Sequence, residues 1–305
     1  MKQTLILDSS QIDTYLGCPT EWLYSYKESL TQTDDDKSAM AMGTLGHKWL
    51  EYYYDFRARN ASVADAVQHA NQINPDILDV DPEDKGEFPL DAEKRAQVRK
   101  RCQEYWMTYS QNDYIPDYKC TYDIEIDPIS SLPRDVQHKV PLIEQGFSYK
   151  LLETPEYLFI LEGRIDFIGS HNNTTFFMDH KFQLRERKLY SKSIQFRNYA
   201  LATGLNLGII NYIRLHKEAS NKTFIREPIS FGSYELKVWR SELINIYVEI
   251  ANAVKHNEFP KRWSSCSGKF GYPCKFTHIC EEPNIQTAQL IKIQNYKKKK
   301  EWKPW

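Results

Sequence analysis

Apolar residues in the first third of the chain recur at the three- to four-residue spacing of helices. Polar residues at positions 8–10 can cap a first helix, whose apolar pattern breaks at Cys18-Pro19. A second helix begins near Ala39, and helical spacing continues to about residue 115 with one polar interruption. The pattern therefore predicts a helical region over about residues 39–115.

The spacing changes to the two-residue alternation of strands further along the chain. Residues 118–126 alternate in this way, whereas residues 128–141 carry three prolines and are predicted to form a loop. Two strands follow, with the sequences YLFILEGRIDFIG and TTFFMDHKF. Then come a helix over Ser193–Thr203, which Gly204 can cap, and a buried strand, LGIINYIRLH.

Strand, helix and strand in this order indicate a crossover unit, and we expect an α/β fold in which helices flank a mixed central β-sheet. A further amphipathic helix is predicted over residues 233–256. We expect a single domain over residues 1–285, followed by a loose basic tail over residues 286–305.

Composition narrows the class of protein. The 305 residues carry a net charge of −1, so nucleic-acid binding would need a local basic patch. No apolar run approaches the roughly 18 residues of a membrane span, and the N-terminal stretch does not resemble a secretory signal. We expect a cytoplasmic protein without membrane contact. Six cysteines in such a protein more often bind metal than form disulfides.

A hairpin with two facing acids is the sharpest chemical signal in the sequence. Asn172-Asn173 can form its tight turn, because asparagine tolerates the left-handed backbone conformation. A turn centred there places Asp166 directly opposite Asp179, with Lys181 on the same face as Asp179. Like charges so placed destabilise a sheet, and a bound divalent cation would offset the repulsion. The alternative is a solvated charged face.

These residues resemble motifs of the PD-(D/E)XK nuclease superfamily, in particular its RecB-like branch of CRISPR-associated adaptation exonucleases and AddB-type nucleases. The segment Gly163–Asp166 is similar to the first acidic motif, and the segment Asp179–Lys181 is similar to the (D/E)-x-K motif. Gln195 and Tyr199 fit the Q-x-x-x-Y helix of that branch. His47 fits its upstream metal-binding histidine.

The matching elements keep their order over about residues 9–282. The resemblance implies a restriction-endonuclease-like fold with its catalytic core over about residues 150–215. It implies a metal-dependent DNA nuclease, and within it an exonuclease acting on DNA ends, single-stranded DNA favoured, in recombination, repair or replication. A structure-specific endonuclease and a non-catalytic DNA-binding protein with a structural metal site are the alternatives.

Two expectations about context accompany this resemblance. The sequence has no P-loop motif, so unwinding of DNA would need a helicase or recombination partner. The compact, stand-alone form is similar to proteins encoded by phages, which would place it in the cytoplasm of a bacterial host.

The implied chemistry is phosphodiester hydrolysis with Mg²⁺ or Mn²⁺, which carboxylate and imidazole ligands suit. The resemblance implies His47, Asp166 and Asp179 as ligands, together with the backbone carbonyl of His180. Lys181 would orient the attacking water or neutralise the phosphate in the transition state.

Two pairs of helical residues have both a chemical and a packing interpretation. Glu51 follows His47 by four residues and shares its helix face, so it is either a ligand candidate or an exposed glutamate. Gln195 and Tyr199 are also four residues apart. They would contact DNA or the catalytic centre, or else Tyr199 packs in the core and Gln195 lies at its boundary.

A second candidate metal site involves cysteines. Cys266, Cys274 and Cys280 have the spacing C-x7-C-x5-C, and Cys18 lies far upstream. Four thiolates suit a [4Fe–4S] cluster or tetrahedral zinc, where His278 could replace a cysteine. Buried free thiols are the third possibility. The pattern resembles the iron–sulfur staple of the RecB-like branch, which often has a shorter first gap, and would join the N- and C-terminal segments.

The remaining candidates are weaker. Cys102 and Cys120 have no partners at ligand spacing and are expected to be free thiols. The lysines at 297–300 could bind nucleic acid or a partner, or only keep the tail soluble. Four basic residues after the (D/E)-x-K motif could grip phosphates or form a solvated loop. These are Arg185, Arg187, Lys188 and Lys192.

Overall fold

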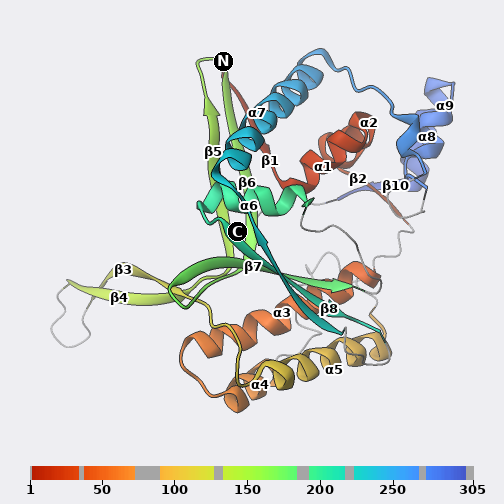
Figure 1. Cartoon of the computed structure of the whole chain (residues 1–305). Coiled ribbons are helices and arrows are strands. Elements are labelled where there is room, and N and C mark those ends of the chain that lie inside the picture. The colour runs from red at the N-terminus through yellow and green to blue at the C-terminus, as the bar shows by residue number, and fades with distance from the viewer. Residues whose placement is uncertain are drawn as a thin grey trace.

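Figure 1 shows the computed structural model of the chain, in which helices lie on both faces of a central sheet. The structure describes residues 2–33, 38–72, 90–126, 133–183, 192–216, 223–267 and 273–299. Within these stretches, six strands form the central sheet. They are β1 (Gln3–Leu7), β5 (Ile143–Glu153), β6 (Tyr157–His171), β7 (Thr174–Gln183), β8 (Leu207–Arg214) and β9 (Phe224–Ser230). The predicted mixed α/β architecture is confirmed.

Strand β6 organises the sheet, because it is long enough to pair with three neighbours. β5 runs antiparallel along one edge of β6. The other edge pairs in parallel with β1 over residues 157–161 and antiparallel with β7 over residues 167–171. Among the described strands, none pairs with residues 162–166 of β6 on this second edge. Beyond β7, the sheet continues with β8, parallel to β7, and β9, antiparallel to β8.

The central sheet has helices packed on both sides, among the nine α-helices of the described stretches. They are α1 (Ser9–Gly17), α2 (Pro19–Trp22), α3 (Ser38–Ala58), α4 (Val63–Gln72), α5 (Ala92–Tyr109), α6 (Ile194–Thr203), α7 (Ser233–His256), α8 (Thr277–Glu281) and α9 (Ile285–Asn295), with a π-helical turn at Leu23–Lys27 and a 3₁₀ turn at Trp263–Ser265. None of them is long and apolar enough to cross a membrane.

Alternation along β7 divides the core between the two faces of the sheet. Phe176 and Met178 are buried in the cluster formed with α3, α4 and α5. Phe177, which points the opposite way, is buried in the cluster formed with α6. In Figure 1 the helices α3–α5 accordingly lie on one side of β7 and α6 on the other. A third cluster joins α1 and α7 to β1, β5 and β6.

Most local predictions are confirmed. Asp8 caps α1, and this helix ends at Gly17, directly before the predicted break. Asn172 and Asn173 both have positive φ, at 49° and 63°, as the tight turn between β6 and β7 requires. Gly204 caps α6 in the left-handed conformation, at φ 73°. Because β7 and β8 are parallel and α6 connects them, the predicted crossover unit is also present.

The predicted loose tail is wrong for residues 286–298, which belong to α9 and a short strand. Two small ribbons lie outside the central sheet, β2 (Leu30–Gln32) with β10 (Tyr296–Lys298) and β3 (Tyr118–Ile126) with β4 (Pro133–Pro141). Tyr296 is buried in a cluster with Leu30 and stacks on Phe276. The polar sequence of this segment gave no sign of regular structure, because the segment is ordered by Tyr296 and by pairing with β2, which is far away in the sequence. Residues 300–305 lie outside the described residues.

The predicted loop over residues 128–141 is also wrong in its second part, since β4 begins at Pro133. Its two prolines stand at the ends of the ladder with β3, opposite Ile126 and Tyr118. A proline is tolerated at these positions, because a strand end loses little when one amide donor is missing. Residues 127–132 are not described. The polar interruption of the helical region falls within residues 73–89, which are not described either.

Candidate active site

A cavity of about 1070 Å³ opens beside the stretch of β6 that has no strand partner on its second edge. Residues of α1, α3, β5, β6, β7 and α6 line it. The predicted site residues His47, Asp166, Asp179, Lys181, Gln195 and Tyr199 all face this cavity, as does Glu51. The fold thus brings together residues that lie up to about 150 positions apart in the sequence.

Side chains take the place of the missing strand along this edge of β6. Tyr199 of α6 donates a hydrogen bond to the carbonyl of Arg164, with 2.6 Å between the two oxygens. The backbone amide of His180 donates to Oδ2 of Asp166 at 2.7 Å. These contacts satisfy polar groups that a sheet ladder would otherwise satisfy, and they fix the Asp166 carboxylate at the end of the β6–β7 hairpin.

The predicted register of this hairpin is confirmed, but the ladder is one pair shorter than predicted. Phe167 faces Met178, and the register continues unchanged to the turn. Asp166 and Asp179 would form the next pair, yet the β6–β7 ladder ends before them. The carboxylate of Asp166, rather than its backbone, then reaches the strand at His180. The two acids flank the opening between the strands instead of standing in a regular sheet.

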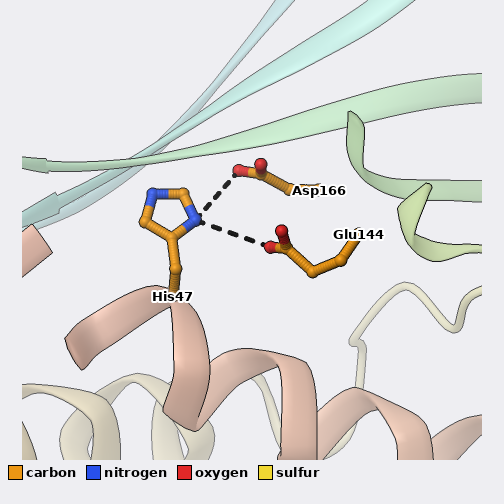
Figure 2. Close-up of side chains that lie close together, drawn as sticks. All are labelled: His47, Glu144 and Asp166. Atoms are coloured by element: carbon orange, nitrogen blue, oxygen red, sulfur yellow. Dashed lines mark ion pairs between the residues drawn. The ribbon is translucent and has the colours of Figure 1, made fainter. Parts of the chain in front are cut away.

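Three side chains from three elements converge at this opening (Figure 2). Nδ1 of His47, from α3, lies 3.2 Å from Oδ2 of Asp166 and 3.9 Å from Oε1 of Glu144, which belongs to β5. One ligand atom from each of the three residues lies within 4.8 Å of the other two. Two carboxylates and an imidazole form a donor set that fits Mg²⁺ or Mn²⁺.

Glu144 was missed in the sequence analysis. It has a positive φ of 49°, which is uncommon for a residue other than glycine. Its Oε2 atom also pairs with Nε of Arg164 at 2.9 Å. The only sequence signal was an acid at the start of an alternating segment. An acid in that position does not differ from an exposed strand glutamate until the fold places it beside His47.

Asp179 lies in the same cavity and belongs to a second group of contacts. Its Oδ2 atom is 2.7 Å from Nζ of Lys181. Gln195 holds both residues, because its Nε2 atom donates to Oδ1 of Asp179 at 3.0 Å and its Oε1 atom accepts from Lys181 at 2.9 Å. Gln195 also donates to the hydroxyl of Tyr199 at 2.6 Å. The predicted Q-x-x-x-Y pair therefore contacts the predicted acid and lysine.

The charges at the opening shift one another's pKa. Burial by itself would lower the pKa of His47, but the charges of Asp166 and Glu144 outweigh it and raise that pKa to about 9. Burial raises the pKa of Glu144 to about 8, with a further rise from Asp166. Burial likewise raises the pKa of Asp179 to about 6, against the effect of Lys181. Burial thus favours the neutral form of both carboxyl groups, and a divalent cation bound beside them would favour the ionised form.

The PD-(D/E)XK nuclease superfamily matches residues 9–281 of the chain. The chain belongs to this superfamily. Its members are nucleases that use divalent metals such as Mg²⁺ or Mn²⁺, which agrees with the donor set of His47, Glu144 and Asp166. Membership of this superfamily suggests a metal-dependent nuclease.

Other comparisons add little to this assignment. Among curated proteins, none shows a significant sequence match to the chain. A solved structure that matches is the crystal structure of SSO0001, with 18% identity and a TM-score of 0.30. The match covers 46% of this chain and 59% of that chain.

His180, between the acid and the lysine of the PD-(D/E)XK motif, turns its ring away from the cavity. The ring stacks on Tyr54 with 5.7 Å between centroids, and its Nδ1 atom lies 2.7 Å from Nδ2 of Asn211. Burial lowers the pKa of His180 to about 3, so the ring is neutral. The ring is thus part of the packing behind the site, while the backbone of His180 faces Asp166.

The four predicted cysteine ligands lie near one another, before α2 (Cys18), after the 3₁₀ turn (Cys266), before α8 (Cys274) and within α8 (Cys280). The amide of Cys274 donates to the carbonyl of Cys266 at 2.8 Å. Burial raises the pKa of Cys280 to about 11, and the nearby thiols of Cys274, Cys18 and Cys266 contribute to the rise. No three of their sulfur atoms lie within 4.8 Å of one another. A bound metal cluster is not shown.

The weaker predictions fall in different places. Glu51 pairs with Lys48 at 2.9 Å at the rim of the cavity. Cys102 is a fully buried free thiol, as expected. Of the basic residues after the motif, Lys192 lines the cavity. Arg185, Arg187, Lys188, Lys300 and the side chain of Cys120 lie outside the described residues. Lys299 lines the cavity too, with its Nζ atom 4.3 Å from the centre of the Tyr26 ring.

Proposed function

We propose that this protein is an exonuclease of the RecB-like branch that hydrolyses single-stranded DNA from its ends. The convergence of His47, Glu144 and Asp166 beside the group of Asp179, Lys181 and Gln195 is the observation that supports this proposal. An anion-binding ammonium group and a set of hard metal ligands share one cavity. Phosphodiester hydrolysis needs both.

His47, Asp166 and Asp179 hold the divalent metal in this proposal, with the carbonyl of His180 and, in addition to the earlier prediction, Glu144. A cation bound there supplies charge relief at the phosphoryl oxygens and makes a nearby water more acidic. The hydrogen bond from the His180 amide orients Asp166 toward the cavity, and Arg164 holds Glu144 beside it. Neutral His180 keeps the backbone of the motif in place from behind.

Lys181 acts on the phosphate or on the attacking water. Its ammonium group is held at the cavity wall by Asp179 and by Gln195, so it is oriented before the substrate arrives. Positive charge placed in advance stabilises the charge that develops on the phosphoryl oxygens without reorganisation cost. Tyr199 keeps Gln195 in position and thereby fixes the geometry of the acid and the lysine.

The size of the cavity favours a single strand. Its volume of about 1070 Å³ is close to the upper end of ordinary small-molecule pockets, so it takes a few nucleotides. A B-form duplex, whose major groove alone is about 12 Å wide, is too large to enter. The free end of a strand reaches residues inside a cavity of this size more readily than an internal segment does, which favours exonuclease action. Unwinding of duplex DNA is left to a helicase or recombination partner.

We further propose that Cys18, Cys266, Cys274 and Cys280 bind a structural [4Fe–4S] cluster. Tetrahedral zinc would hold four sulfurs about 3.8 Å apart, given Zn–S distances of about 2.3 Å. No three of these sulfurs lie within 4.8 Å of one another, whereas a larger iron–sulfur cluster spans more distant thiolates. Such a cluster would join α1 and α2 to the segment that follows α7.

A digestion series tests the proposed function. Linear and circular DNA, each single- and double-stranded, are incubated with Mg²⁺ or Mn²⁺, and Lys181→Ala serves as the matched control. We expect loss of linear single-stranded DNA only. Cutting of circular single-stranded DNA would identify an endonuclease instead. Binding of DNA without any metal-dependent cleavage would identify a non-catalytic DNA-binding protein.

A further inference from the structure

The first half of α3 turns one face toward the active-site cavity. Met40, Gly43, Thr44, His47, Lys48 and Glu51 line the cavity at the three- and four-residue spacing of one helix face. The opposite face, with Leu45 and Trp49, is buried in the core. Figure 2 shows His47 rising from this helix toward Asp166 and Glu144. The residues that precede His47 on the same face therefore lie next to the reacting phosphate, if the proposed function holds.

On this face of α3, the space beside the Cα atom of Gly43 is not filled by any described residue. A Cβ atom added at Gly43 would meet no heavy atom within 4 Å. Glycine is a poor helix former, because it loses more conformational freedom on folding than any other residue. None of the described residues packs against this position, so the missing side chain leaves room for a molecule bound in the cavity.

Gly46, three residues later in the same helix, shows the contrast. A Cβ atom at Gly46 would overlap the ring of Phe182, which packs against α3. Packing within the protein therefore explains Gly46. The same explanation is not available for Gly43, and the two positions form a matched pair within one helix.

Met40 stands one turn before Gly43 and is 62% exposed. An unbranched thioether side chain adapts to varied surfaces and makes favourable contacts with aromatic rings. The hydroxyl of Thr44 bonds back to the carbonyl of Met40 at 3.2 Å, so it needs no other partner. Met40, Gly43 and Thr44 together form an uncharged strip on the cavity wall, which we call the α3 strip.

Charge distinguishes the α3 strip from the wall formed by α1. Asp8 and Asp13 line the cavity on the α1 side and repel a polyanion. The α3 strip carries no carboxylate, and one turn further along the same face Lys48 pairs with Glu51 at 2.9 Å. An anionic backbone is therefore favoured along α3 rather than along α1.

We propose that the α3 strip is the subsite for the nucleotide next to the scissile phosphate of a single DNA strand. The sugar-phosphate backbone packs on Gly43, and the base lies against the thioether of Met40. Gly43 precedes His47 by four residues, about 6 Å along the helix axis. This distance places Gly43 within one nucleotide of the proposed metal ligands His47, Glu144 and Asp166. This inference rests on the proposed function, and it specifies how the substrate strand is seated.

The matched glycines test the subsite. Gly43→Ala, Gly43→Leu and Gly46→Ala are compared with the wild-type protein in thermal unfolding, in cleavage of linear single-stranded DNA, and in anisotropy binding of a labelled single-stranded oligonucleotide with Ca²⁺ in place of Mg²⁺. We expect Gly43→Ala to keep or raise Tm and to weaken oligonucleotide binding at least fivefold. Gly43→Leu weakens it further. Gly46→Ala lowers Tm, because Phe182 has to move.

Two results would overturn the subsite while leaving the nuclease assignment intact. One is a pair of Gly43 variants that fold, bind and cleave like the wild-type protein. The other is a fall in Tm for Gly43→Ala as large as that for Gly46→Ala, which would show that position 43 is packed. If the wild-type protein neither binds nor cleaves single-stranded DNA, the proposed function fails, and the subsite with it.

Met40→Ala tests the position of the base. Several-fold weaker binding of the oligonucleotide with an unchanged Tm would support the contact between the base and Met40.

Discussion

Nδ1 of His47 lies 3.2 Å from Oδ2 of Asp166, although the two residues come from different elements and are far apart in the sequence. In this arrangement the imidazole carries a proton at neutral pH, since its pKa is raised to about 9. A metal bound by His47 has to displace this proton. Metal affinity is therefore coupled to pH.

The first prediction follows from this coupling. Between pH 7 and pH 9, affinity for Mn²⁺ rises with pH, because protonated His47 competes with the metal below its pKa of about 9. Release of one proton gives about a tenfold change in affinity per pH unit. Glu144, with its pKa raised to about 8, steepens the dependence at the lower end of this range. Titration calorimetry across the range measures it, and an affinity that does not change with pH would contradict the assignment of His47.

A second prediction separates metal binding from chemistry. Lys181→Ala should lower the cleavage rate at least about 100-fold, as expected when one preorganised charge is removed. Affinity for Mn²⁺ should stay within a few-fold of the wild-type value, because the ammonium group is not a ligand. Asp179→Ala is the matched variant, and it should lose both cleavage and Mn²⁺ binding. Wild-type cleavage by Lys181→Ala would show that the chemistry is assigned to the wrong residue.

The third prediction concerns Gln195, which touches both Asp179 and Lys181. Gln195→Ala should lower kcat by about 10- to 100-fold, the usual effect of losing a residue that orients the groups at a metal site. The KM for DNA should change little. Tyr199→Phe removes only the hydroxyl that supports Gln195 and bonds to Arg164, so its effect should be smaller. A KM effect without a kcat effect would assign Gln195 to substrate binding instead.

A buried ion pair behind the site gives a prediction about stability. Arg226 pairs with Asp113, which is almost fully buried, and its guanidinium lies over the ring of Tyr109 at 3.6 Å. Arg226→Met leaves the Asp113 carboxylate without its cation and should lower the free energy of unfolding by about 3–5 kcal/mol, measured by urea denaturation. The double variant with Asp113→Asn should recover part of this loss.

The way in which the stability of Arg226→Met changes with pH shows whether the unpaired Asp113 carboxylate causes the loss. Burial already raises the pKa of Asp113 in the folded protein, and removal of Arg226 raises it further. A raised carboxyl pKa means that the folded state binds more protons than the unfolded state, so stability falls as pH rises. Arg226→Met should therefore lose less stability at pH 5 than at pH 8. An equal loss at both values would indicate a packing defect rather than an unpaired charge.

A further prediction concerns the four cysteines that are proposed to bind a cluster. Protein purified without oxygen should be brown, with absorbance at about 400 nm from iron–sulfur charge transfer. Cys280→Ser should lose this colour and unfold at a lower temperature. A colourless protein with one equivalent of zinc would reject the cluster, and a metal-free protein of unchanged stability would leave only free thiols.

Local signals in the sequence were sufficient for much of the sheet and for the hairpin. The turn at Asn172-Asn173 has few conformations available to it, so the register around Phe167 and Met178 could be derived by counting from the turn. The helix over Ser193–Thr203 likewise carries its own caps. These elements are specified by residues within a few positions of one another, which a single sequence contains.

The parts that were missed depend on distant contacts. Glu144 becomes a ligand candidate only when β5 is aligned beside β6 and opposite α3. Tyr296 fixes the C-terminal strand through contacts with residues more than 250 positions away. Where the ladder between β6 and β7 ends, the Asp166 carboxylate accepts from the His180 amide of β7, and Tyr199 donates to the Arg164 carbonyl of β6. Spacing within one segment carries no information about such partners.

The most direct test of the central claim is cleavage of linear single-stranded DNA by the wild-type protein and by Asp166→Asn, each with and without Mn²⁺. Asp166 contacts His47 and accepts a hydrogen bond from the backbone amide of His180, so it connects the proposed metal ligands to the (D/E)-x-K segment. We predict metal-dependent cleavage by the wild-type protein, and neither cleavage nor tight Mn²⁺ binding by a folded Asp166→Asn variant. Equal cleavage by the two proteins would contradict the account.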